Sequence, residues 1–302
     1  MKFNSILKSY AVVCTLTLLV ACNSNKENEV VEKEESNDVQ EVKPINDSEL
    51  LRKFTSDASG YYINRGNAMA DEFQAQMTKE NTDVEHRGEV SSEVLEGSKF
   101  YDTYKKQVLI FGEMYKCGHC PDFHINACSA FPISKDGICV TNYHAFKPLD
   151  PSEPTNYETA FVMDWEGKVY PVVEVLAANR QDDLAIFRVK CKESDFTPLA
   201  LGNDKNTGEP IHVISHPDHR LYRYTKGCIN RTYFDQRIST MRQSISAEFA
   251  RGSSGAPVLD NCGNLVGVIA GTTNISYRPN GEIYQMTIKD MIPVSRLHNL
   301  IK

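Results

Sequence analysis

Phe249–Gly267 reads FARGSSGAPVLDNCGNLVG, and this stretch decides how the rest of the chain is interpreted. Its centre, Gly252–Pro257, holds two serines between two glycines and ends at a proline. A glycine-rich loop can direct several backbone N–H groups at one point, because glycine adopts φ values that other residues avoid. Two apolar runs around Asp260–Asn264 follow and predict a β-hairpin. A serine in such a loop can lie beside an oxyanion hole, and a plain surface turn is the alternative.

The chain from Val108 onward consists of short apolar runs separated by turn signals such as Lys135–Gly137. Many short strands at nearly regular spacing predict an all-β barrel or sandwich. The final segment, Val294–Ile301, has apolar residues at helical spacing and predicts a closing helix. The predicted strands are Val108–Phe111, Ala130–Ser134, Ile138–Asn142, Ala160–Asp164, Lys168–Val175, Leu184–Lys190, Ile211–Ser215, Arg220–Asn230, Ser239–Ser246, Pro257–Leu259, Leu265–Ala270 and Ile283–Ile288.

Residues 1–22 have the pattern of a targeting segment. Lys2 and Lys8 precede an apolar core, Tyr10–Ala21, that is short for a membrane span. The segment ends in the letters LVAC, with Cys22 last, and this resembles the lipobox of bacterial lipoproteins. The resemblance implies cleavage before Cys22 and a lipid on that cysteine, so that acyl chains hold the protein on a membrane. A plain secretory signal is the alternative, and both predict export from the cytoplasm.

Two further segments precede the predicted strands. Residues 23–47 are polar and acidic and contain no aromatic residue. They cannot bury enough surface to fold, which predicts a disordered tether. Residues 48–106 carry apolar residues at roughly helical spacing, among them Met69, Phe73 and Met77, and predict a helical N-terminal segment.

The charge of the chain narrows the class of partner. The formal net charge is −7, and much of it lies in residues 23–49, which hold nine acidic residues and three lysines. The rest of the chain is close to neutral and has no stripe of basic residues. We therefore exclude nucleic acid as a partner.

Three residue types that acyl transfer needs occur in the predicted β region. His144 lies just past one predicted strand, Asp183 lies just before another, and Ser254 lies in the glycine-rich loop. A serine nucleophile requires a base for its proton and a carboxylate that fixes the tautomer of the base. We predict these roles for Ser254, His144 and Asp183. The backbone amides of Gly252 and Ser254 are the predicted oxyanion hole.

Four segments resemble bacterial trypsin-like serine peptidases of the chymotrypsin fold. They are Ser134–Phe146 with the histidine, Asp182–Val189 with the acid, Pro198–Pro217 at the crossover, and Gly252–Val268 with the serine. The order histidine, aspartate, serine is that of chymotrypsin. In the family the acid directly precedes an aliphatic–Ala pair, which assigns the role to Asp183 rather than Asp182. The resemblance implies two packed antiparallel β-barrels in residues 107–302, at about 107–195 and 196–302, with the site between them.

The serine loop departs from the family pattern Gly-Asn-Ser-Gly-Gly-Pro at two positions. Ser253 replaces the asparagine, and Ala256 replaces the second glycine and fits only if its φ is negative. An ungapped count from Ser254 places Glu248 near the base of the primary pocket and Ala270–Thr272 at its wall. Because about fifty residues follow Ser254, we expect no PDZ-like domain after the peptidase domain.

The cysteines supply competing chemistry. Residues 117–120 read CGHC, the loop of protein disulfide isomerases, but no helical pattern follows it as a redox site requires. Cys117, Cys120, His124 and Cys128 also have the spacing of a metal site. In an exported protein, disulfide bonding is the leading interpretation. Seven cysteines follow Cys22, and an odd number leaves at least one unpaired with another on the chain.

These observations together favour a lipid-anchored serine endopeptidase of the bacterial cell envelope. It is expected to hydrolyse polypeptide substrates with a Ser-His-Asp triad and without a cofactor or metal. One alternative is a binding module of the same fold with little or no turnover. A less favoured alternative is a thiol–disulfide protein that uses Cys117 and Cys120. The sequence indicates neither the substrate preference nor the oligomeric state.

Overall fold

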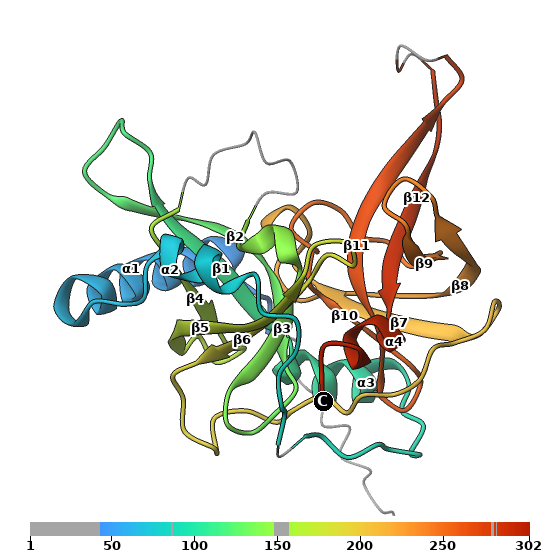
Figure 1. The fold of residues 1–302 in the computed structure, drawn as a ribbon, viewed down its shortest axis with the longest axis horizontal. Coiled ribbons are helices and arrows are strands. Elements are labelled where there is room, and N and C mark those ends of the chain that lie inside the picture. The colour runs from blue at the N-terminus through green and yellow to red at the C-terminus, as the bar shows by residue number, and fades with distance from the viewer. Residues whose placement is uncertain (1–42, 86, 148–156, 279–280, 282) are drawn as a thin grey trace, which may run out of the picture. The chain divides into compact units, whose positions relative to one another are not determined.

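The computed structural model describes residues 43–85, 87–147, 157–278, 281 and 283–302. The predicted signal segment, Cys22 and the predicted tether up to residue 42 lie outside these residues. Residues 44–302 form one unit, in which helices are followed by a first barrel, a second barrel and a short helix (Figure 1). No helix in the described residues is both long and apolar enough to span a membrane.

The first barrel is closed by six antiparallel strands in the spatial order β1-β2-β3-β6-β5-β4, with β4 paired back to β1. Its interior is rich in aromatic side chains. The rings of Phe111, Phe146 and Phe187 meet edge to face, with centroids 5.1 to 5.5 Å apart. The strands are β1 (Leu109–Lys116), β2 (Phe123–Pro132), β3 (Ile138–Thr141), β4 (Thr159–Met163), β5 (Val169–Asn179) and β6 (Leu184–Val189).

The second barrel has the spatial order β10-β11-β12-β9-β8-β7 and is closed by the pairing of β10 with β7. Its core is aliphatic, and Ile211, Val213 and Val258 are fully buried in it. Two closed antiparallel barrels confirm the predicted fold class. The strands are β7 (Pro210–Ser215), β8 (Arg223–Asp235), β9 (Thr240–Ile245), β10 (Pro257–Leu259), β11 (Leu265–Ser276) and β12 (Tyr284–Pro293).

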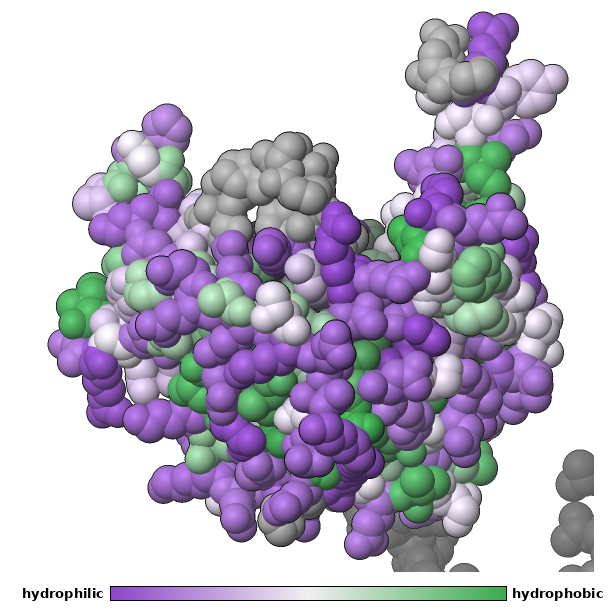
Figure 2. All heavy atoms as spheres, viewed as in Figure 1, coloured by the Kyte–Doolittle hydropathy of each residue, from purple (hydrophilic) through white to green (hydrophobic). Residues whose placement is uncertain are grey.

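The hairpin of β11 and β12 extends past the rest of the second barrel as a two-stranded arm (Figure 1). The sequence predicted that the first of these strands ends at Ala270, whereas β11 continues to Ser276. Most of the added residues, such as Thr272 and Asn274, are polar and exposed, so they lack the apolar alternation that indicates a half-buried strand. Figure 2 shows hydrophobic side chains among hydrophilic ones along this arm. Its exposed apolar residues are Ile275, Tyr277, Ile283, Tyr284 and Met286.

The N-terminal segment is helical only in part, which differs from the prediction for residues 48–106. A turn and irregular chain over residues 77–85 and 87–96 separate the second helix from the third. This stretch runs along the surface of the barrels. Arg87 in it forms an isolated bridge with Ser134 of the first barrel. The helices are α1 (Asp47–Arg65), α2 (Ala70–Gln76) and α3 (Gly97–Tyr104), followed by the 3₁₀ helix η1 (Lys105–Gln107).

Two local contacts set the ends of the terminal helices. Asn46 caps α1, because its Oδ1 atom accepts the Glu49 N–H at 3.1 Å, so the helix begins one residue inside the predicted tether. The C-terminal helix α4 (Val294–His298) ends earlier than predicted, and Ile301 instead pairs with Thr82 in an isolated bridge. The predicted closing helix is therefore present but short.

Candidate active site

His144 and Asp183 lie together at the edge of the first barrel. His144 belongs to the 3₁₀ helix η2 (Tyr143–Ala145), directly after β3, and Asp183 precedes β6. His144 Nδ1 lies 2.9 Å from Asp183 Oδ2, and the His144 backbone N–H donates to Asp183 Oδ1 at 3.1 Å. The Asp183 side chain is 8% exposed and the His144 side chain 32%. The carboxylate is thus held in the protein while the imidazole retains an open face.

The charge of Asp183 changes the proton affinity of His144. Burial lowers the pKa of His144, but the Asp183 carboxylate and its hydrogen bond outweigh this effect, and the pKa lies above its usual value. Asp183 itself has a φ of +61°, which is unusual for a residue other than glycine. Asn142 Nδ2 donates to the Asp183 carbonyl at 2.9 Å and holds this conformation.

The neighbouring Asp182 forms an ion pair with Arg296 and not with His144. Its carboxylate is buried and accepts two hydrogen bonds, each of 2.9 Å, from Arg296 of α4, together with one from Thr240. The structure therefore places Asp183, and not Asp182, against His144.

The loop that carries Ser254 is held against the strands that lead to His144. The Ser129 N–H on β2 donates to the Ser254 carbonyl at 2.9 Å. At Gly255, where φ is +79°, an added Cβ would lie 2.3 Å from Thr141 Oγ1 of β3. Ser254 is partly exposed, and its hydroxyl makes no hydrogen bond to His144 within the described residues. The second barrel thus presents Ser254 beside the end of β3, where His144 follows.

Gly252 has a conformation that no other residue would fit. Its φ is +89°, and an added Cβ would lie 2.6 Å from the His216 carbonyl oxygen. Its own carbonyl accepts a hydrogen bond from the Ser129 hydroxyl at 3.2 Å. Among the described residues, no acceptor is found for the Gly252 or Ser254 backbone N–H groups. Both amides of the predicted oxyanion hole are therefore unoccupied by other protein groups.

The two departures from the family loop are accommodated. Ser253 is fully buried, and its hydroxyl donates to Ser215 Oγ on β7 at 3.0 Å. Ala256 is also buried and has a negative φ, as its fit in the loop requires. Of the adjacent serines, Ser253 faces the second barrel, and Ser254 is left partly accessible.

One residue near His144 was not found by sequence reasoning. Glu113 on β1 is half-buried, and Asn126 Nδ2 donates to its carboxylate at 2.7 Å. Burial raises the pKa of Glu113 to about 7, and its charge contributes to the raised pKa of His144. In the sequence, Glu113 resembles a solvent-facing residue of an alternating strand. No local signal marked it.

A cleft of about 700 Å³ opens beside Asp183. Its wall includes Asp290 of β12 and Ala270–Thr273 of β11, and the count from Ser254 had assigned Ala270–Thr272 to the wall of the primary pocket. Glu248 is not among the described residues that line it. The Glu248 carboxylate is 65% exposed and pairs with Lys289 Nζ at 2.9 Å. The cleft has instead a half-buried acid in Asp290, whose pKa is raised by partial burial.

Residues 128–268 match the family described as trypsin-like peptidase domain. The chain contains a trypsin-like peptidase domain. Over 147 residues it is 30% identical to Protease Do-like 8, chloroplastic, of Arabidopsis thaliana, covering 43% of this chain and 32% of that protein. Over 144 residues it is 24% identical to the probable periplasmic serine endoprotease DegP-like of Brucella suis, covering 46% and 26%.

The trypsin-like peptidase domain also resembles part of a protein that is not named as a protease. Anti-sigma-I factor RsgI9 of Acetivibrio thermocellus is 29% identical over 136 residues, which are 44% of this chain and 18% of that protein. The chain thus spans a third or less of the length of these relatives.

Solved structures share the fold of the trypsin-like peptidase domain. HtrA-type protease AlgW with decapeptide superposes with a TM-score of 0.52 at 18% identity, covering 67% of this chain and 65% of that one. HtrA-type protease AlgW with tripeptide gives a TM-score of 0.52 at 18% identity, covering 67% and 61%. At this level of identity the likeness bears on the fold alone.

Proposed function

We propose that this chain is a serine endopeptidase in which Ser254 is the nucleophile, His144 the general base and Asp183 the orienting acid. The observation that carries the proposal is the pair of hydrogen bonds from His144 to Asp183, beside the docked serine loop. Peptidase family membership supports the reaction class. The structures named with bound peptides support a polypeptide substrate.

Each residue has a defined step in the proposed reaction. Ser254 Oγ attacks the peptide carbonyl carbon, and His144 Nε2 takes the hydroxyl proton and later gives it to the leaving amine. Asp183 accepts the Nδ1 hydrogen, which keeps Nε2 free to act as the base. The Gly252 and Ser254 amides donate to the oxyanion, and such a donor typically contributes about 2.7–4 kcal/mol. Water then hydrolyses the acyl-enzyme, with His144 again as base.

The location of the peptidase follows from the N-terminal residues. We infer that residues 1–22 direct export and that Cys22 carries a lipid, with the acidic residues after it as the tether. The printed name of the Brucella suis relative, a periplasmic endoprotease, supports an envelope location. All seven cysteines from Cys117 onward are thiols in the structure. The formation of disulfides between them in the cell envelope is part of the proposal.

The adjacent serines provide a matched test of the nucleophile. We expect a fluorophosphonate probe to label the wild type and Ser253→Ala but not Ser254→Ala or His144→Ala. Ser253→Ala is the control because its hydroxyl is buried on Ser215. Circular dichroism of each variant verifies folding. Labelling of Ser254→Ala would refute the assignment.

One observation favours a second candidate, a binding module without turnover. Within the described residues, the Ser254 hydroxyl is not hydrogen-bonded to His144. Catalytic hydrogen bonds are often long in unliganded enzymes, so this geometry does not exclude activity. A folded wild type that binds unfolded polypeptide but reacts with no fluorophosphonate would support the binding module.

A further inference from the structure

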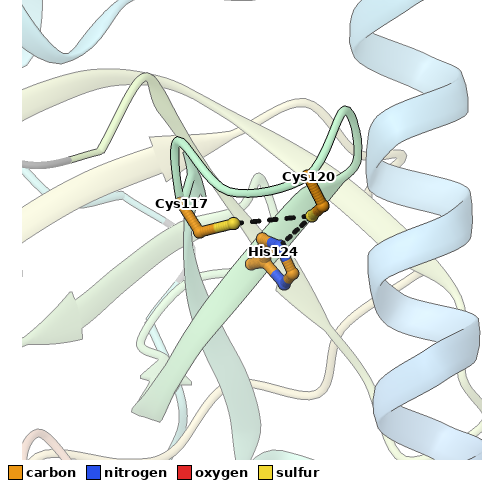
Figure 3. Close-up of side chains that lie close together, drawn as sticks. All are labelled: Cys117, Cys120 and His124. Atoms are coloured by element: carbon orange, nitrogen blue, oxygen red, sulfur yellow. Dashed lines mark hydrogen bonds between the residues drawn. The ribbon is translucent and has the colours of Figure 1, made fainter.

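A second cluster of reactive side chains lies outside the proposed active site, at the tip of the β1–β2 hairpin. Cys117 Sγ and Cys120 Sγ are 3.4 Å apart, and Cys120 Sγ lies 3.0 Å from His124 Nε2 (Figure 3). One donor atom from each residue lies within 4.8 Å of the other two. The three side chains are partly exposed, so an ion has access to them.

The separations between these donor atoms are close to those of a tetrahedral metal site. With Zn–S of about 2.3 Å and Zn–N of about 2.0–2.1 Å, tetrahedral angles place the donors roughly 3.6–3.8 Å apart. The sulfur pair would open by about 0.4 Å, and the Cys120–His124 pair by about 0.6 Å, to admit an ion at this geometry. Rotations of exposed side chains supply such shifts without moving the strands.

The backbone around the cluster supports a thiolate ligand. The His119 N–H donates to Cys117 Sγ at 3.4 Å, in the way that outer hydrogen bonds orient metal ligands. Gly118 has a φ of +75°, which turns the chain between the two cysteines. His124 pairs with Tyr115, one pair before the last pair of the hairpin, and this places the residue near the hairpin tip.

We propose that Cys117, Cys120 and His124 bind a divalent ion of the zinc class. Two thiolates and one imidazole are a preferred donor set for such an ion, and each thiol releases its proton to solvent when it binds. The fourth position is open to water or to a donor from another molecule. Cys128 does not belong to the site, which corrects the four-residue set suggested by its spacing.

The test uses the full chain, reduced and then freed of reductant and metal. Titration with Co²⁺ is expected to give a thiolate-to-metal absorption band that saturates at one ion per chain, and Zn²⁺ should displace it. Cys117→Ser and His124→Ala should each weaken binding by more than the 10–100-fold that loss of an outer partner costs. His119→Ala and Cys228→Ser are the matched controls, and both should keep the band.

Two outcomes would overturn the proposal. One is a folded, reduced wild type that binds no Co²⁺ or Zn²⁺. The other is binding that Cys228→Ser removes and Cys117→Ser leaves intact. Because Ser254→Ala should bind the ion as the wild type does, failure of the metal site and failure of the peptidase assignment are distinguishable.

Discussion

At the scale of single residues, the proton affinity of His144 depends on two carboxyl groups, one on β1 and one in the turn before β6. Asp183 is bonded to the ring, whereas Glu113 acts through its charge. A base must be neutral to accept a proton, so activity should rise as the pH rises through the pKa of His144. Any group that raises this pKa moves the acid limb of the activity profile to higher pH.

Replacement of Glu113 by glutamine should therefore shift that limb. The variant removes the negative charge that Glu113 gains as the pH rises through its pKa of about 7, and it keeps an acceptor oxygen for Asn126, so the fold should be retained. We expect the acid limb of kcat/KM to move to lower pH while the plateau stays unchanged. Asp183→Asn is the contrast, with a plateau lower by about 10⁴-fold. A pH profile with a peptide substrate measures both, and an unshifted limb in Glu113→Gln would contradict the role of its charge.

Protonation of His144 has opposite effects on the stability of the fold and on the expected activity. A group whose pKa is raised in the folded state stabilises the fold below its unfolded pKa, and this contribution is lost as the pH rises through the folded value. The protonated imidazole beside Asp183 is such a group. The pair therefore contributes least to stability over the pH range in which the proposed enzyme is most active.

The predicted site residues could be selected from the sequence because their types, their order and the glycine pattern are local signals. Glu113 could not be selected, because its relation to His144 depends on the closure of the barrel. The same holds for the orientation of Ser253 toward Ser215, which joins residues 38 positions apart. Sequence spacing contains no information on such contacts.

At the scale of elements, a buried ion pair holds α4 in place. Asp182 precedes β6 of the first barrel, and Arg296 lies on the last helix of the chain. Removing one partner of such a pair leaves the other charge buried and uncompensated. This contact joins the first barrel to the C-terminal helix.

Arg296→Ala should lower the free energy of unfolding by about 3 kcal/mol, the lower end of the range for a broken buried pair, because the Arg296 side chain is 29% exposed. Urea unfolding followed by circular dichroism measures this change. Arg220→Ala is the matched control, since Arg220 pairs with the exposed Asp218 and should cause little change. Equal effects of the two variants would contradict a special role for the Asp182–Arg296 pair.

The apolar runs predicted most strands because one face of each strand is buried in a barrel. The exceptions include the parts of β2, β8 and β11 outside the predicted runs, where most residues are half-buried or exposed and pair with a neighbouring strand. A strand that is only paired with its neighbour, and buries neither face, needs no alternation of apolar residues in its sequence. The irregular chain at residues 77–85 and 87–96 was missed for a related reason, because contacts with the barrels rather than local propensity determine its path.

At the scale of the whole molecule, the proposed lipid anchor determines where the peptidase domain works. Cys22→Ala should move the protein from the membrane fraction to the soluble fraction after cell lysis and ultracentrifugation, because a signal segment without its lipidated cysteine leaves no acyl chain. Cys228→Ser, at a distant cysteine, is the control and should remain with the membrane. Unchanged partitioning of Cys22→Ala would refute lipidation.

The contact between the Ser254 loop and strands β2 and β3 has a consequence for biosynthesis. In the proposed mechanism, the base and acid come from the first barrel and the nucleophile comes from the second. Neither half of the chain can cleave a peptide before the Ser254 carbonyl meets the Ser129 amide. On this mechanism, a newly made chain that is still unfolded or half folded would not cleave its neighbours. Docking of the two barrels is then the step that completes the proposed catalytic site.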